Sequence, residues 1–554
     1  MTATNLPSLQ KSDNSSRSFR VQYNGENDRK DYKMATRLAE LPADCGKQPI
    51  CGCIGFCRGE AFGTGVRSGA QYVDGIRDDG RHVVHDGDVI RDVTTHPAFE
   101  GAVTSVAGIF DNASAQENAE LMTYASPVTG DRVNRHWAMP RSKEELVARR
   151  KALTKTSELT LGLMGRSPDH VAGFFAGYAM APEVLARGGQ KFADNAVKFY
   201  EFCRDHDMYI AYTIVPPQID RTKPAHQQEP PDLYAGIVEE RDDGVIIRGA
   251  QMLGTGAVLA DFVQLSTIHP MRQGDENYAI SVAVPCNAPG VKIFSRRSYA
   301  AAANSVFDYP LASRFDETDS LFVYEDVFVP WERVFVYKNI DVARAQWFEA
   351  PAHIMGNSQA QIRYMTKLRF LVGLAKKITD MNGTGSLPPV IGELGKLATY
   401  ASMYEGLVYA QEAECWTNDN GYVLPSMPHI YANMNLQSEI NPKLLDIVRE
   451  LAGGGLIQLP SSVEDLKNPE IRDTITKYVQ SPGVPGEDRI KLMKLAWDMI
   501  GSEFAGRHEQ YEKFYAGAPF IVKTHAHRTY DWDRATDLVD YALSGYDING
   551  RKTQ

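Results

Sequence analysis

The chain has 554 residues, more than a single hydrophobic core normally supports, so we expect two or three packed domains. Its 43% apolar and 23% charged residues are ordinary for a globular protein and argue against a disordered or fibrous chain. The formal net charge of -11 makes the average surface repel phosphate groups. This charge argues against nucleic acid or an anionic membrane as the main partner.

The first residues lack the basic-then-apolar order of a secretory signal, and the longest apolar runs fall far short of the roughly 20 residues that span a bilayer. We therefore expect a cytoplasmic protein. Seven cysteines are too few for a disulfide framework in a chain of this length. Cys203, Cys286 and Cys415 also stand alone in the sequence, so reduced thiols are the simplest interpretation.

Residues 1–66 show no sustained apolar period, and we interpret them as an N-terminal extension. This segment contains Cys45, Cys51, Cys53 and Cys57. Only the spacing from Cys53 to Cys57 resembles a zinc knuckle, and Cys51 lies too close to Cys53 for a usual one. A zinc or iron–sulfur site and a turn of free thiols both remain open, and the thiol turn is the interpretation we favour.

Residues 67–206 have helical patterns and predict a helical domain. Ser142 precedes a charged, helix-forming run, and Glu145 follows three positions later, which is the pattern of a capping box. Apolar residues also recur at helical spacing over residues 189–205, which predicts a second helix there.

Residues 207–341 contain short β-branched runs separated by turn residues, which predicts an antiparallel β domain. The expected strands cover residues 244–249, 262–265, 278–284, 290–294 and 321–324. Helical patterns return in residues 342–554, which we interpret as a C-terminal helical bundle. The expected long helices cover residues 359–381, 389–418 and 489–515, with an interruption at the glycines 453–455.

Six short motifs occur along this chain in a characteristic order. They are SGAQY at 68–72, DVTTHPAF at 92–99, PRSKEEL at 140–146, GRSPD at 165–169, VPWER at 329–333 and LAWD at 495–498. In sequence and order these motifs resemble the 4-hydroxyphenylacetate 3-monooxygenase family, over residues from about 68 to about 530. The order of helices, sheet and helices is also that of the acyl-CoA dehydrogenase-like flavoproteins.

The resemblance implies an α+β fold of the acyl-CoA dehydrogenase-like type and an FAD-dependent monooxygenase. Such an enzyme uses reduced FAD, often supplied by a separate flavin reductase, and O2 to oxygenate an aromatic or related cyclic substrate through a flavin-peroxide. The resemblance also implies a homodimer or homotetramer, and the apolar faces of residues 359–418 suit subunit contacts.

The same resemblance points to Arg166, His170 and Tyr212 as catalytic and substrate-binding residues. Arg166 lies beside a glycine and ahead of Pro168, where a permanently charged guanidinium can serve as a donor at a bend. The family usually has a tyrosine where this chain has His170, and a histidine where it has Tyr212, so the two side chains are exchanged. From the residues alone, Arg166 could instead pair with Asp169 or cap a helix, and the other two could simply be packed.

Further positions match segments that line the flavin or the substrate in the family. The expected cofactor-binding residues are Thr213, Ile214, Val215, Gln218, Arg221, Gly254, Thr255, Gly256, Arg528 and Thr529. Glycines would let the backbone approach a flat ring, and threonine hydroxyls can hydrogen-bond to flavin. We also consider His269 as a substrate-binding residue, although a histidine before a proline is more often part of a turn.

Three alternatives stay open at the level of sequence. The first is an oxygenase acting on a thioester of CoA or of a carrier protein, because the fold resembles that of acyl-CoA enzymes. The second is a lyase similar to 4-hydroxybutyryl-CoA dehydratase, but the Arg166 segment has no cysteine to hold the cluster of that branch. The third is a scaffold that binds no flavin.

Overall fold

The computed structural model describes residues 63–551, and the four cysteines of the N-terminal extension lie outside this range. The first part of it is mainly helical. Its larger elements are α3 (Gly69–Ile76), α4 (Glu100–Ser114), α6 (Lys143–Leu159), α7 (Pro168–Met180), α8 (Pro182–Ala186) and α9 (Gln190–Asp205). As predicted, the Ser142 hydroxyl caps α6 by accepting the Glu145 N–H, but the Glu145 carboxylate accepts the N–H of Arg141 in place of that of Ser142, so the return bond of a capping box is not formed.

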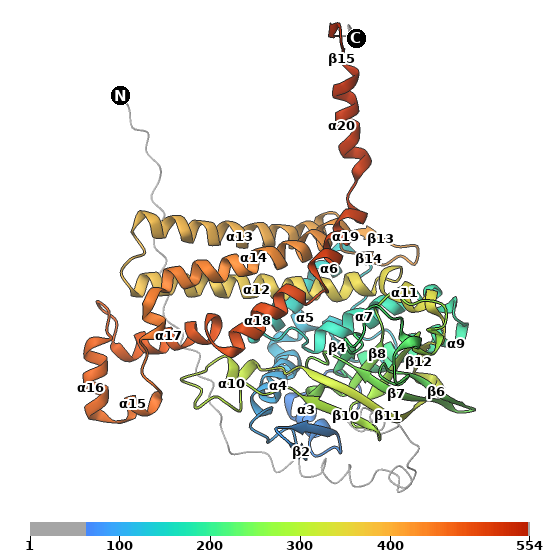
Figure 1. Cartoon of the computed structure of the whole chain (residues 1–554), viewed down its shortest axis with the longest axis horizontal. Coiled ribbons are helices and arrows are strands. Elements are labelled where there is room, and N and C mark those ends of the chain that lie inside the picture. Colours follow the sequence, from blue (N-terminus) through green and yellow to red (C-terminus); the bar gives the residue numbers. More distant parts are fainter. Residues whose placement is uncertain (1–62, 552–554) are drawn as a thin grey trace. The chain divides into compact units, whose positions relative to one another are not determined.

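The strands form two main sheets (Figure 1). The six-stranded sheet has the order β2-β1-β10-β11-β7-β6, and the four-stranded sheet has the order β12-β9-β8-β5. Their bounds are β1 (His82–His85), β2 (Asp88–Ile90), β5 (Ile210–Thr213), β6 (Gly236–Arg241), β7 (Gly244–Gln251), β8 (Phe262–Ser266), β9 (Ser281–Pro285), β10 (Val291–Ser295), β11 (Ser320–Pro330) and β12 (Val334–Val336).

The sheets differ from the expectation in two respects. Two pairs, β1 with β10 and β5 with β8, are parallel, whereas the other pairs are antiparallel. The strands β1 and β2 also come from the segment that we expected to be only helical, yet β1 pairs with β10 of the six-stranded sheet. These strands have only four and three residues, too short to show a clear alternation of apolar and polar residues.

The C-terminal part is helical again. Its elements include α11 (Ile340–Phe348), α12 (Ala352–Met381), α13 (Pro388–Ala413), α14 (Met427–Ala452), α16 (Pro469–Tyr478), α17 (Gly486–Ile500), α18 (Glu503–Phe514), α19 (Pro519–Thr529) and α20 (Trp532–Ser544). The three longest, α12, α13 and α14, lie side by side (Figure 1). The helix expected over 489–515 is two helices, because α17 ends at Ile500 before Gly501. Among the described helices, none is long and apolar enough to cross a membrane.

Helix α7 is buried along its whole length and packs against α12. Two glycines on α7 make this contact very close. A Cβ atom on Gly173 would lie 2.9 Å from the Met355 carbonyl oxygen, and one on Gly177 would lie 2.3 Å from the Ala352 nitrogen. The spacing of four residues places both glycines on one face of α7. The close packing brings polar side chains of α12 against the beginning of α7.

Candidate active site

The segment before α7 is held by a buried carboxylate. Glu317, 1% exposed, accepts the backbone N–H of Gly165 at 3.0 Å and that of Arg166 at 2.9 Å. The same carboxylate lies 3.1 Å from the Arg507 guanidinium of α18. A Cβ atom on Gly165 would lie 2.1 Å from the Tyr511 hydroxyl, so any larger residue there would displace the Tyr511 ring. Glu317 therefore fixes the backbone that carries Arg166.

The Arg166 guanidinium is buried among aromatic rings. Its Nη2 donates to the Tyr515 carbonyl oxygen at 2.8 Å, and its Cζ lies 5.3 Å from the ring centroids of both Tyr212 and Tyr511. Within residues 63–551 its Nη1 has no hydrogen-bond partner. A buried guanidinium stays charged, so this N–H is available to a ligand oxygen.

His170 lies in the first turn of α7 and is 1% exposed. Its Nδ1 lies 2.9 Å from Oε1 of Gln359, whereas its Nε2 has no partner in the described part of the chain. Burial and the charge of Arg166 hold the pKa of His170 well below its usual value, which keeps the imidazole neutral.

Tyr212 comes from β5 and faces the same two side chains. Its ring centroid lies 5.6 Å from that of His170, and Phe174 stands 5.3 Å from His170 and 5.6 Å from Tyr212. The structure therefore brings together Arg166, His170 and Tyr212, the three residues that we expected to carry the chemistry. The expected exchange of histidine and tyrosine preserves one imidazole and one phenol beside the arginine.

The two buried segments expected to contact flavin lie next to this group. Thr213 is fully buried, with its hydroxyl 2.9 Å from that of Tyr324, and it continues into Ile214 and Val215. On the second segment, the Thr255 hydroxyl donates to Asp319 at 2.6 Å. A hydroxyl that donates to a carboxylate can still accept a hydrogen bond from a ligand N–H.

The turn at Gly254 and Gly256 lies directly against the Arg166 segment. Gly256 has a φ of +72°, and a Cβ atom on it would lie 2.6 Å from the Tyr209 hydroxyl and 3.2 Å from the Arg166 carbonyl oxygen. That carbonyl also accepts the Tyr209 hydroxyl at 2.5 Å. The expected substrate arginine and the expected flavin turn are thus neighbours.

The other expected residues lie farther toward the surface. Gln218 and Arg221 are exposed and hydrogen-bonded to each other, and His269 is also exposed. Burial, followed by the charge of Arg221, lowers the pKa of His269.

Arg528 and Thr529 end α19, beside a cluster of stacked aromatic rings. The Thr529 hydroxyl donates to the His525 carbonyl oxygen at 3.1 Å. The His525 ring stacks on Tyr431 at 5.0 Å and lies 5.5 Å from His353. Arg528 is exposed. The pKa of His525 is lowered mainly by the burial of its own ring and, to a smaller extent, by the positive charge of Arg528.

Three polar residues of the site escaped the sequence analysis: Glu317, Asp319 and Gln359. Their only signal is position. The two acids lie in an acidic run just before an apolar strand, and Gln359 interrupts a buried stretch of α12. Neither pattern identifies a partner, because the residues that they contact are more than 60 positions away in the sequence.

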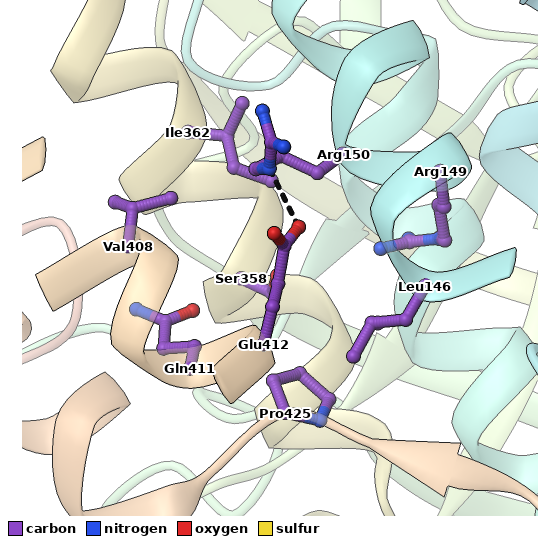
Figure 2. A pocket seen from close by; sticks show the side chains of 9 residues that line it. All are labelled: Leu146, Arg149, Arg150, Ser358, Ile362, Val408, Gln411, Glu412 and Pro425. Atoms are coloured by element: carbon purple, nitrogen blue, oxygen red, sulfur yellow. Dashed lines mark hydrogen bonds and ion pairs between the residues drawn. The ribbon is translucent and has the colours of Figure 1, made fainter. Parts of the chain in front are cut away.

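A cavity between α6, α12 and α13 is too small to hold a substrate (Figure 2). Its volume is about 10 Å³, the space of about one water molecule. Its lining includes the ion pair of Arg150 with Glu412, drawn as a dashed line. Within residues 63–551, no three His, Cys, Asp or Glu side chains are placed to hold a metal ion.

The residues present fit a flavin. The turn at Gly254 and Gly256 lets a flat ring approach the backbone closely, and Thr213 and Thr255 offer hydroxyl groups. In the described chain, the buried hydroxyls of Tyr511 and Tyr515 have no hydrogen-bond partner. Buried polar atoms normally have partners, so a set of unsatisfied ones around aromatic walls is typical of a ligand site.

Comparison with known proteins identifies the family. Residues 68–336 match the 4-hydroxyphenylacetate 3-hydroxylase N-terminal family, and residues 343–544 match the corresponding C-terminal family. The chain is 34% identical over 493 residues to the 4-hydroxyphenylacetate 3-monooxygenase oxygenase component of Klebsiella oxytoca, covering 87% of this chain and 94% of that protein. It is 33% identical over 496 residues to the 4-nitrophenol 2-monooxygenase oxygenase component of a Rhodococcus species, with 87% and 93% covered.

A solved structure agrees with these relatives. The crystal structure of the oxygenase component (HpaB) of 4-hydroxyphenylacetate 3-monooxygenase, complexed with FAD and 4-hydroxyphenylacetate, superimposes with a TM-score of 0.82 at 29% identity. The match covers 86% of this chain and 98% of that one. The expected family and fold are therefore confirmed, and this chain belongs to the 4-hydroxyphenylacetate 3-hydroxylase family.

Proposed function

We propose that this chain is the oxygenase component of an FAD-dependent monooxygenase that inserts one atom of O2 into an aromatic substrate bearing a hydroxyl group. One observation carries the proposal. Two buried polar atoms, Nη1 of Arg166 and Nε2 of His170, have no partner in residues 63–551. Nη1 is a donor, and Nε2 is an acceptor when the ring hydrogen lies on Nδ1, so a phenolic hydroxyl, which accepts one hydrogen bond and donates another, suits this pair.

FAD is the cofactor of the proposal, and matching crystal structures of HpaB are complexes with FAD. When bound in its reduced form, it supplies the electrons for the activation of O2. The residues proposed to hold it are those of the two buried segments, with Thr213, Ile214 and Val215 on one side and Gly254, Thr255 and Gly256 on the other. Gln218, Arg221, Arg528 and Thr529 are proposed for its more exposed parts.

The protein side chains orient the substrate and polarise its hydroxyl group. Arg166 donates to the substrate oxygen and stabilises negative charge that develops on it. His170, held neutral, accepts a hydrogen bond from the hydroxyl at Nε2, which draws electron density from the O–H bond into the ring. Tyr212 and Phe174 provide the aromatic walls. Because Arg166 and His170 are 8% and 1% exposed, water has little access to these atoms.

The partners of the proposal are O2, the aromatic substrate and a separate flavin reductase, because the matching relatives are named oxygenase components. We also propose a homodimer or homotetramer. Helix α20 supports this, because none of its residues is buried within the described chain. Its large apolar side chains Leu538 and Tyr541 are 71% and 70% exposed, and a second subunit could cover them. We also propose a cytoplasmic location. His269 is proposed to contact the substrate only from the outer side of the site, because its side chain is exposed.

The test is a substrate screen with the full chain, FAD and a flavin reductase that supplies reduced FAD. Free phenolic acids and their CoA thioesters are incubated in air and analysed by mass spectrometry. We expect a product with one additional oxygen atom from a free phenol. Oxygenation of thioesters alone would favour a tethered substrate, and only hydrogen peroxide with every compound would contradict the oxygenase.

A further inference from the structure

The buried side chains behind His170 determine which of its two ring nitrogens carries the hydrogen. Gln359 of α12 is 1% exposed and lies between His170 and Asp169. Its Oε1 is 2.9 Å from Nδ1 of His170, and its Nε2 is 3.1 Å from Oδ1 of Asp169. The amide thus bridges an imidazole and a carboxyl group.

The contacts of Asp169 favour one orientation for this amide. Asp169 is fully buried, its Oδ1 accepts the Ser167 hydroxyl, and as a carboxylate oxygen it accepts hydrogen bonds and donates none. The amide therefore turns its NH2 group toward Asp169. The opposite orientation would set two acceptor oxygens against each other in a buried place.

This orientation leaves only Oε1 to face the imidazole. Because a carbonyl oxygen only accepts, the hydrogen must lie on Nδ1 of His170. The neutral ring then carries a bare lone pair on Nε2, the atom that has no partner within residues 63–551. The charged or titratable groups acting on this ring are Arg166, Arg363 and His353, and all three oppose a second proton.

We propose that Gln359, held by Asp169 and Ser167, is a positioning residue that locks His170 in its Nδ1–H form and so selects a substrate group that donates a hydrogen bond. This inference rests on the proposed function, because it names the role of the same site. It favours a neutral phenol, or a ring amine with an N–H, over a phenolate or a ring with no donor.

The close packing of α7 on α12 explains why Gln359 can reach this position. Gly173 and Gly177 let the two helices approach, and replacing either hydrogen with a methyl group would push α12 outward. The bridge is specific to the exchange of side chains noted above. A tyrosine at position 170 has no ring nitrogen whose hydrogen Gln359 could hold.

The proposal is tested with the full-length variant Gln359→Met, which keeps the length of the side chain but removes both polar groups. The matched control is Gln361→Met. Gln361 is equally buried on the same helix, but its amide binds the Ile430 carbonyl oxygen and Gln411 instead. The conservative variant Gln359→Glu retains an acceptor toward His170, since two adjacent buried carboxyl groups share one proton.

The first readout is independent of activity. Protein labelled with 13C at histidine Cδ2 is examined by NMR at pH 8, and the resonance of His170 is assigned by its loss in His170→Gln. We expect the Nδ1–H form in the parent chain, in Gln361→Met and in Gln359→Glu. We expect a mixture or the Nε2–H form in Gln359→Met. The Nε2–H form in the parent, or no change in Gln359→Met, would overturn the proposal.

The second readout is binding of phenol and of toluene, its isostere without a hydroxyl, to the FAD-loaded chain. We expect the preference for phenol to fall about 2- to 10-fold in Gln359→Met, the range of one neutral hydrogen bond, and to stay unchanged in Gln361→Met. An equal fall in both variants would contradict the positioning role. A parent chain with the Nδ1–H form but no oxygenated product would refute the proposed function and leave the positioning role intact.

Discussion

The substitution Glu317→Gln tests whether one buried carboxylate holds the substrate arginine in place. Glu317 accepts two backbone N–H groups, from Gly165 and Arg166, and pairs with Arg507. Glutamine keeps one acceptor oxygen but sets an NH2 group against the other N–H. We therefore expect the loss of one charge-assisted hydrogen bond and one buried N–H without a partner.

The cost follows from these two losses. The hydrogen bond contributes about 1.5 to 3 kcal/mol, and the unsatisfied N–H costs about 1 to 3 kcal/mol, so the free energy of unfolding should fall by about 2.5 to 6 kcal/mol. Arg507 keeps its two contacts with Asp319, which limits the loss. For a cooperative unit of about 500 residues, this corresponds to a decrease in melting temperature of about 2 to 6 °C.

Differential scanning calorimetry measures this change. The matched control is Glu325→Gln, which breaks an exposed pair with Lys292 and should cost less than about 1 kcal/mol. We also expect weaker phenol binding in Glu317→Gln, because the backbone of Arg166 is released. If Glu317→Gln had the same melting temperature as Glu325→Gln and bound phenol as tightly as the parent chain, the anchoring role would be refuted.

Three further predictions concern the same region. Arg166→Lys should weaken phenol binding roughly 10-fold in a titration, with FAD binding unchanged, because lysine lacks the second donor arm. Thr255→Val should lower FAD affinity, more for the reduced form with its additional N–H than for the oxidised form, and equal affinity for both forms in parent and variant would contradict this role. Burial lowers the pKa values of His136 and His353 to about 3, so only the unfolded chain gains these protons below about pH 6.5. Each histidine should therefore reduce the free energy of unfolding by about 1.4 kcal/mol per pH unit as the pH falls toward 5, measured by denaturant titration, and a flat profile would refute it.

Much of the fold was predictable because it depends on local patterns. The cap at Ser142 and the helix over 190–205 come from neighbouring residues, and the motif order identified the family. The break between α17 and α18 was missed, since a single glycine was outweighed by helical residues on both sides. The short strand β1 owes its existence to pairing with β10, about 200 residues away, which no local pattern reveals.

The candidate site divides in the same way. Arg166, His170 and Tyr212 were expected from matched motifs, and the structure places them together. Glu317 and Gln359 were not expected, because their roles depend on hydrogen bonds to residues more than 150 positions away. A buried glutamine in a helix looks like any packed polar residue until its two partners are known.

The measurement that tests the proposed function most directly uses 18O2. The full chain, FAD, a flavin reductase and the phenol that performs best in the screen are mixed under labelled oxygen, and the product is analysed by mass spectrometry. We predict one 18O atom in each product molecule, and less labelled product from Arg166→Lys when the phenol concentration is limiting. A product oxygenated from water, or reduction of all the labelled oxygen to peroxide while the phenol stays unchanged, would contradict the proposal.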